Sequence, residues 1–112
     1  MHDTSATLNG ECAPWPDKEG LASILRNAGL KVSVGRYSVN VSDCGGFSFQ
    51  HFGGDRGDPV ISADAETPEL MIKDGQLVSS ALSAAGVTHR FEIYDHEDRL
   101  VAYMHHNWPR VV

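Results

Sequence analysis

Two stretches of the chain carry apolar residues at the spacing of an amphipathic helix. In the first, the residues that share one helix face are Leu21, Ile24, Leu25 and Ala28. Their i, i+3, i+4 and i+7 spacing is typical of a helix with one buried side. Asp17 is placed to cap the first turn, and Gly29 can adopt the left-handed conformation that ends a helix. We therefore predict a helix between these two residues.

The second helical stretch begins at Thr67 and Pro68, since threonine is a good N-cap and proline is tolerated in the first turn. The apolar residues expected on its buried face are Leu70, Leu77, Val78, Ala81, Leu82 and Ala85. Gly86 is expected to end it. Gly75 lies in the middle and costs about 1 kcal/mol of helix stability relative to alanine, so this position is a candidate for a break.

Between the helices the apolar period changes to two, which is typical of half-buried strands. Val32 and Val34 alternate in one phase, whereas Val39 and Val41 follow in the other phase after Gly35. One extra residue in a strand inverts the phase of its side chains. We therefore interpret Gly35 as a β-bulge.

Further strands follow on both sides of the second helix. Turn residues at 42–46 precede a partner strand at 47–52, and a short extra strand is predicted at 60–63. The clearest hairpin joins residues 89–94 to residues 99–106 through a four-residue loop. That loop length puts the following apolar side chains on one face: Phe91, Ile93, Leu100, Ala102 and Met104.

Together these elements predict one α+β domain built as a two-layer sandwich. We expect an antiparallel sheet of four to five strands with two helices on one face, in the order α-β-β-(β)-α-β-β. The domain is expected to span residues 15–109. Residues 1–14 are polar and lack periodicity, so they are interpreted as a flexible N-terminal tail, and residues 110–112 as a short C-terminal tail.

The two helices and the residues after them are similar to each other. Residues 21–30 align with residues 78–87 with four identical positions in ten. One interpretation is a duplicated α-β-β unit. The other is that any helix ending in Ala-Gly before a strand has this pattern, because a C-cap favours glycine followed by an apolar residue.

The chain is acidic: its 112 residues include 15 Asp and Glu against 9 Lys and Arg, a net charge of −6 with histidine neutral. Nucleic acids and anionic membranes attract clustered cations, so this balance argues against both as partners. No apolar run approaches the roughly 18 residues of a membrane helix, and the first residues lack the features of a signal peptide. Cys12 and Cys44 do not form a secreted disulfide framework, so we expect a cytoplasmic protein.

The sheet face turned away from the helices carries the candidate binding residues. Its arginines, tyrosines, glutamate and histidine are Arg36, Arg90, Glu92, Tyr94, Arg99, Tyr103 and His105. Tyr and Arg are enriched at the hot spots of protein interfaces. These residues therefore predict a surface for a protein partner or for a second copy. The alternative is cross-strand pairing of Glu92 with Arg90 or Arg99 on a solvated sheet.

The histidines raise two chemical alternatives. A metal site would combine His105 and His106 with His51 and His89, but adjacent strand residues point to opposite faces and no paired-histidine motif is present. We therefore assign no metal ligand and no cofactor. An acid–base or small-molecule site would use His51 and His105 with nearby carboxylates. The chain lacks a nucleophile elbow and a phosphate-binding loop, so no catalytic residue is assigned.

The sequence thus favours a small acidic domain without catalytic activity that binds a protein partner or itself through the polar sheet face. One subtype that fits the charge is a protein that covers a basic target, as an antitoxin or immunity protein does. The alternative is a small-molecule-binding or acid–base protein with a histidine–carboxylate site near His51 and His105. Whether the domain is an enzyme is left open by the sequence.

Overall fold

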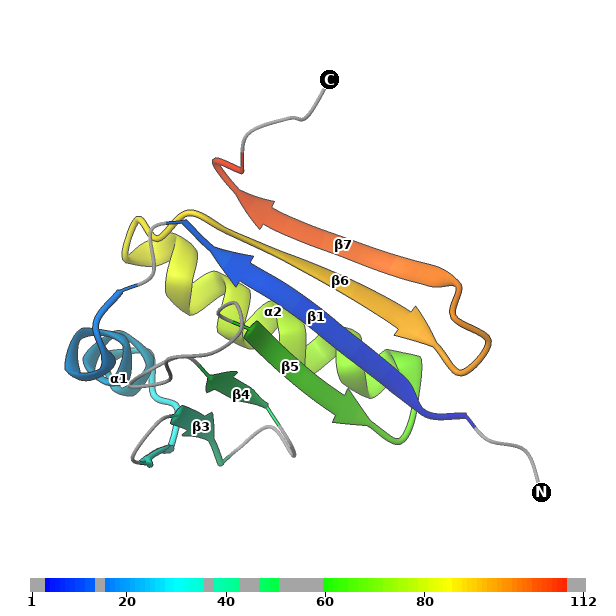
Figure 1. Ribbon diagram of the computed structural model, residues 1–112, viewed down its shortest axis with the longest axis horizontal. Coiled ribbons are helices and arrows are strands. Elements are labelled where there is room, and N and C mark those ends of the chain that lie inside the picture. The colour runs from blue at the N-terminus through cyan, green and yellow to red at the C-terminus, as the bar shows by residue number, and fades with distance from the viewer. Residues whose placement is uncertain (1–3, 14–15, 36–37, 43–46, 51–59, 109–112) are drawn as a thin grey trace.

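The computed structural model describes residues 4–13, 16–35, 38–42, 47–50 and 60–108. Within these residues the chain forms two helices and seven strands (Figure 1). In chain order they are β1 Ala6–Cys12, α1 Lys18–Asn27, β2 Val32–Val34, β3 Ser38–Val41, β4 Ser48–Gln50, β5 Val60–Ala65, α2 Pro68–Ala84, β6 His89–Asp95 and β7 Leu100–His106. The strands form one antiparallel sheet in the order β2-β3-β4-β5-β1-β6-β7. The α+β class with two helices is confirmed, whereas the sheet has seven strands instead of four to five.

Both helices begin and end where the sequence predicts. The side chains of Asp17 and Thr67 accept hydrogen bonds from backbone N–H groups of the first turn, at 2.6 and 3.2 Å. Gly29 and Gly86 follow the helices with φ of +88° and +76°, a conformation that glycine adopts without a steric penalty. No helix in the described part of the chain is both long and apolar enough to cross a membrane.

The N-terminal segment departs most from the expected fold. Residues 6–12, which the pattern assigns to a flexible tail, form β1 and pair with β5 on one side and β6 on the other. Alternate residues of β1 are buried, and the polar residues between them face away from the core. Pairing on both sides satisfies the backbone N–H and C=O groups of the strand. This tertiary pairing outweighs the weak intrinsic β-propensity of a segment that contains alanine and glycine.

The segment around Gly35 is a turn and not a bulge. β2 and β3 form a hairpin in which Val34 lies opposite Val39 and Val32 opposite Val41. The Gly35 N–H donates to the Ser38 carbonyl at 2.8 Å and closes the hairpin. Residues that face each other across an antiparallel hairpin share a side of the sheet. A chain reversal can shift the apolar alternation by one position, as one inserted residue does. The change of phase in the sequence therefore marks the reversal between β2 and β3.

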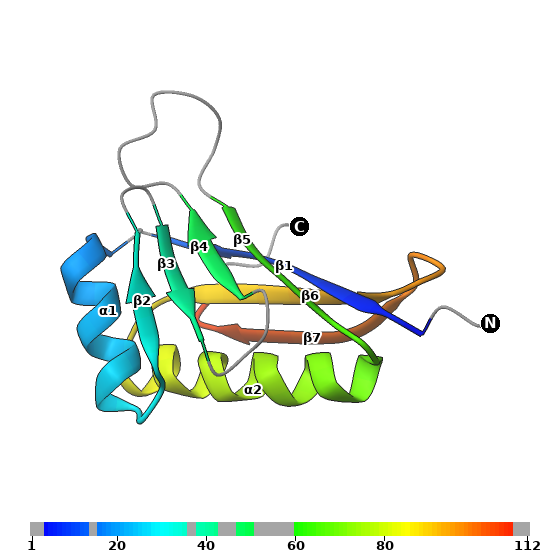
Figure 2. The ribbon, with the colours of Figure 1, turned by 90° about the horizontal axis from the view of Figure 1, so that it is seen from below.

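The helices and the sheet enclose one hydrophobic core (Figure 2). α2 packs against β5, β1, β6 and β7, and α1 packs against β2, β3 and α2. In Figure 2, β2–β4 run at a steep angle to β6 and β7, so the sheet bends around the core instead of forming the flat layer of a plain sandwich. Large, fully buried side chains of the core include Phe47, Phe49, Phe91, Leu8, Leu21, Leu25 and Ile61.

α2 continues through Gly75 without a break. A Cβ at Gly75 would lie 3.2 to 3.4 Å from side-chain atoms of β1, β6 and β7, so the glycine lets the helix approach the sheet closely. Leu70, Leu77 and Ala85, expected on the buried face, are exposed instead. The buried face of α2 also includes a glycine and a serine, which an apolar pattern does not count. The predicted face is therefore rotated by about one residue from the observed one.

A β-bulge changes the pairing at the start of β7. Ile93 lies opposite Ala102 but Tyr94 lies opposite Leu100, so Val101 is the extra residue. Leu100, expected under the helices, is consequently 53% exposed. The other apolar positions of the hairpin face the core as the alternation predicts.

The two similar helix segments lead into strands at different places in the sheet. The strand after α1 is β2, at one edge, whereas the strand after α2 is β6, an interior strand beside β1. The shared ending agrees with the C-cap interpretation, because both helices end with a left-handed glycine and an apolar residue that packs against the core.

The position of β1 can be tested by the substitution Gly10→Ala. A Cβ at Gly10 would lie 2.6 Å from a ring atom of Phe91 and 2.8 Å from the backbone carbonyl of Arg90. Overpacking costs about 1–3 kcal/mol, more than the roughly 0.4–1 kcal/mol that alanine gains from reduced chain entropy. We expect urea denaturation to show a net loss of about 1–2 kcal/mol, against less than about 0.5 kcal/mol for the exposed control Asn9→Ala. Equal stability of the two variants would contradict the central position of β1.

Candidate functional site

Five of the predicted binding residues lie on the outer face of the sheet, the face turned away from the helices. β6 contributes three of them at alternate positions, between residues that are buried in the core. On β7, His105 lies opposite Arg90 and Tyr103 lies opposite Glu92. Glu11 of β1 lies opposite Arg90 on its other side. Since residues directly opposite in an antiparallel pair share a face, these side chains form a continuous patch across β1, β6 and β7.

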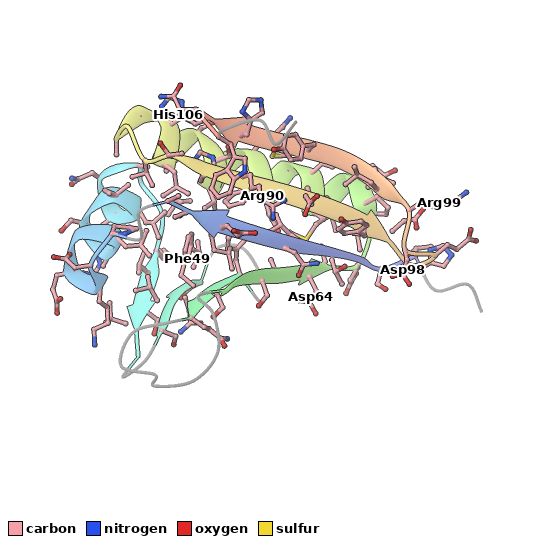
Figure 3. The ribbon with its side chains drawn as sticks, turned by 45° about the horizontal axis from the view of Figure 1, so that its top comes forward. Phe49, Asp64, Arg90, Asp98, Arg99 and His106 are labelled. Atoms are coloured by element: carbon pink, nitrogen blue, oxygen red, sulfur yellow. The ribbon has the colours of Figure 1, made fainter. Side chains whose placement is uncertain are left out.

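Arg90 is at the centre of this patch (Figure 3). Its guanidinium forms ion pairs with Glu11 and with Glu92, the latter at 2.9 Å from Nη1 to Oε1. The ring of Trp108 lies over the guanidinium, with the Cζ atom 5.3 Å from the ring centroid. The Arg90 Nε is buried and has no hydrogen-bond partner among the described residues.

The patch is named here the Arg90 cluster, and it consists of Glu11, Arg90, Glu92, Tyr103, His105 and Trp108. Its fixed charges are two carboxylates and one guanidinium, so its net charge is −1 with histidine neutral. Burial of the guanidinium opposes its charge, but the hydrogen bonds and charges of Glu11 and Glu92 outweigh burial and raise the pKa of Arg90. The guanidinium is therefore charged at neutral pH and paired with both carboxylates.

An exposed aromatic pair extends the cluster toward the edge of the sheet. The Tyr103 and His105 rings lie 5.4 Å apart between centroids, and Tyr103 is 47% exposed. Tyrosine in such a position offers a large, rigid contact area with a polar group at its end. This part of the patch is open to a partner, whereas the Arg90 side chain is only 26% exposed.

Three predicted residues do not join the cluster. Tyr94 shares the outer face of β6 but lies opposite Leu100, at the turn end of the strand. Arg99 lies in the β6–β7 turn, where its Nε pairs with Asp95 at 3.0 Å and its Nη2 with Glu97 at 3.2 Å. Arg99 therefore stabilises the turn and is not a member of the sheet face. The backbone hydrogen bond from Arg99 is the largest of the interactions that lower the pKa of Asp95. Arg36 lies outside the described residues.

Sequence reasoning missed two members of the cluster, Glu11 and Trp108. Glu11 could have been found from the alternation of β1, in which Thr7, Asn9 and Glu11 separate small or apolar residues. Trp108 follows the last strand, and no periodicity relates it to the sheet face. Its position depends on how the chain turns after β7, beyond the reach of a strand pattern.

On the inner face, His89 and Ser79 form a buried pair. Ser79 Oγ lies 2.7 Å from His89 Nε2, and His89 Nδ1 lies 2.9 Å from the carbonyl oxygen of Val87. Because a carbonyl only accepts, Nδ1 donates to Val87 and Nε2 accepts from the Ser79 hydroxyl. A serine, a histidine and an orienting acceptor are the minimum for a nucleophile. Here His89 is fully buried and Ser79 is 8% exposed, so the pair satisfies its polar groups within the core.

The same end of the core holds a row of titratable residues. Cys12 and His106 lie opposite His89 on the two neighbouring strands, and the rings of His89 and His106 stack 6.3 Å apart. Burial raises the pKa of the Cys12 thiol to about 12, so it remains a neutral thiol. In the described part of the chain, no three His, Cys, Asp or Glu side chains are arranged to hold a metal ion.

A surface depression of about 650 Å³ lies beside β5 and α2, away from the Arg90 cluster. Its lining residues are Ser5, Asp64, Ala65, Glu66, Leu70, Lys73 and Asp74. This lining contains carboxylates but no histidine. His105 packs against Tyr103 on the outer face, and His51 lies outside the described residues. The expected combination of His105 with a carboxylate is therefore not formed at this depression.

Comparison with protein-family models, with curated proteins and with solved structures finds no match to this chain.

The His89–Ser79 pair predicts a pH-dependent stability. Burial, followed by the charges of His106 and His105, lowers the pKa of His89 below its ordinary value, against the opposing effect of the Val87 hydrogen bond. The unfolded chain then binds a proton near pH 6.5 that the folded chain resists. The stabilising contribution of His89 is present above about pH 6.5 and is lost as the pH falls through the lowered pKa.

We expect the free energy of unfolding to decrease between about pH 7 and pH 5, and the variant His89→Gln to weaken this dependence. His96→Gln in the exposed β6–β7 turn is the matched control and should keep it. The measurement is urea denaturation at a series of pH values. The same slope in the His89 variant as in the unaltered chain would refute the assignment.

Proposed function

We propose that this protein is a non-catalytic module that binds a protein partner through the Arg90 cluster. The observation that carries the proposal is the guanidinium of Arg90, held between Glu11 and Glu92 under the ring of Trp108. A side chain fixed before binding loses less conformational entropy when a partner arrives. Arginine and aromatic residues that are partly enclosed also have the composition of interface hot spots.

The chemistry of the patch supports a protein partner over a nucleic acid. The net charge of the cluster is −1 and that of the chain is −6, so a phosphate backbone is repelled. Tyr103 and His105 provide aromatic contact area with polar groups, which suits a partner surface of mixed polarity. We also propose a cytoplasmic location, which suits the free and buried thiol of Cys12.

The alternative function, a small-molecule or acid–base site built on histidine and carboxylates, has weaker support. The depression beside β5 has the volume of a ligand pocket. Its three carboxylates face Lys73 as the nearby cation and have no histidine among the lining residues that would serve as a proton donor or acceptor. The Arg90 cluster is therefore the better basis for a function.

The proposal is tested with the double variant Arg90→Ala/Trp108→Ala. Its matched control is Lys73→Ala/Leu77→Ala, which removes one cation and one large apolar residue from exposed positions of α2. Quantitative capture from native extract identifies candidate partners, and titration of each purified candidate against the three proteins measures affinity. We expect the cluster variant to weaken binding roughly tenfold or more, equivalent to about 1.4 kcal/mol, and the control to bind as the unaltered chain does.

Circular dichroism melts show whether each variant remains folded. The Arg90 ion pairs are partly exposed, and surface pairs contribute about 0–1 kcal/mol each, so we expect the cluster variant to stay folded. Equal affinity of the cluster variant and the unaltered chain for every captured partner would refute the Arg90 cluster as the binding site.

A further inference from the structure

β7 forms a long edge of the sheet. It is the last strand in the sheet order, and within the described residues it pairs with β6 alone (Figure 1). The opposite edge, β2, has three residues, whereas β7 has seven. An unpaired strand edge presents N–H and C=O groups that can bond to another chain.

The composition of β7 lacks the usual protection of an edge strand. Natural edges carry lysine, proline or inward-pointing charges that block pairing with another strand. Leu100–His106 contains no Lys, Arg, Asp, Glu or Pro. Leu100, Val101 and Tyr103 are 53%, 41% and 47% exposed, so apolar surface lies next to the open backbone. The bulge at Val101 is the one protective feature, and it lies at the end of the strand.

We propose that β7 pairs with β7 of a second copy of this chain, antiparallel and about a two-fold axis at Tyr103, so that two sheets become continuous. Pairing centred on Tyr103 defines the register: Tyr103 lies opposite itself and Ala102 lies opposite Met104, and the bulge at Val101 ends the regular pairing. This inference goes beyond the proposed function: the second copy takes the open backbone edge of β7, whereas the captured partner takes the outer face around Arg90.

Charge favours a second copy in this antiparallel orientation. The turn before β7 holds three carboxylates, Asp95, Glu97 and Asp98, against the guanidinium of Arg99, a net charge of −2. The other end of β7 holds His105 and His106. Figure 3 shows His106 at the end of the hairpin opposite Asp98 and Arg99. Antiparallel pairing brings the acidic end of each copy beside the histidine end of the other, whereas parallel pairing would put two acidic ends together. The strand between the ends is uncharged, so no like charges face each other directly along it.

The side chains also suit self-pairing in this register. Ala102 lies opposite Met104 of the second copy, a small residue against a large one, on the side of the core. Tyr103 meets its own symmetry mate on the outer face, and aromatic pairs across strands are among the favourable cross-strand contacts. An extended peptide from a different protein would use the same backbone groups, and the experiment separates this occupant from a second copy.

The test introduces a charge of either sign at Tyr103 and measures dimerisation by sedimentation velocity over a concentration series. Tyr103→Lys and Tyr103→Glu each put like charges opposite each other in the proposed register, and like charges directly opposite destabilise a strand pair. We expect the unaltered chain to dimerise and each variant alone to raise the dimer dissociation constant roughly tenfold or more. An equimolar mixture of the two variants should dimerise again, because lysine then faces glutamate.

Two controls separate edge pairing from other contacts. Leu77→Lys adds the same charge at a residue of the same 47% exposure on α2, and it should dimerise as the unaltered chain does. Arg90→Ala/Trp108→Ala changes the outer face and leaves the β7 backbone intact, so it should also keep the dimer while losing the captured partner.

A monomer at every concentration of the unaltered chain would overturn the proposal, and this measurement needs no variant to fold. A dimer that survives both single charge variants, or a mixture that fails to restore it, would overturn it as well. Binding of a different protein at the β7 edge of a monomeric chain would do the same. None of these results changes the affinity measured for the Arg90 cluster, so failure of self-pairing and failure of the proposed function are distinguishable.

Discussion

The pairing of β1 on both of its sides is the interaction on which the rest of this structure depends. β1 joins the β2–β5 part of the sheet to the β6–β7 hairpin, and without it these two parts share no strand pairing. The contact requires a small residue at Gly10, since Phe91 lies against it. The same register puts Glu11 opposite Arg90. The first strand of the chain therefore both completes the core and supplies one carboxylate of the candidate binding surface.

Local rules predicted the parts of the fold that local interactions determine. The caps at Asp17 and Thr67 and the terminating glycines were predictable, because capping involves residues a few positions apart. β1 was missed because its stability comes from partners distant in sequence, and its alanine and glycine weaken the strand signal. The sequence pattern predicts one bulged strand where the structure has the hairpin of β2 and β3, since both produce the same change of phase around Gly35.

The binding surface also contains positions that local rules predict and positions that they do not. Alternation along β6 and β7 predicts which side chains share a face, so Arg90, Glu92, Tyr94, Tyr103 and His105 were placed on one face from the sequence. Alternation fails where a strand ends. Arg99 belongs to a turn, and Trp108 reaches Arg90 from beyond β7. Neither position follows from a period of two.

The two faces of β6 have different roles in this account. The inner face encloses a neutral histidine, which makes the core sensitive to acid, beside a buried thiol that stays neutral. The outer face holds a fixed cation between two carboxylates, and the adjoining strand ends the sheet with an open backbone. The buried histidine and the paired cation both depend on β6 being an interior strand that pairs with β1.

Amide hydrogen exchange along β1 tests this requirement most directly. If residues 6–12 form a strand bonded on both sides, their amides exchange about as slowly as those of β6 and more slowly than those of the edge strand β2. Exchange of residues 6–12 at the rate of an unstructured segment would contradict the account, because the sheet would then lack the strand that unites its two parts.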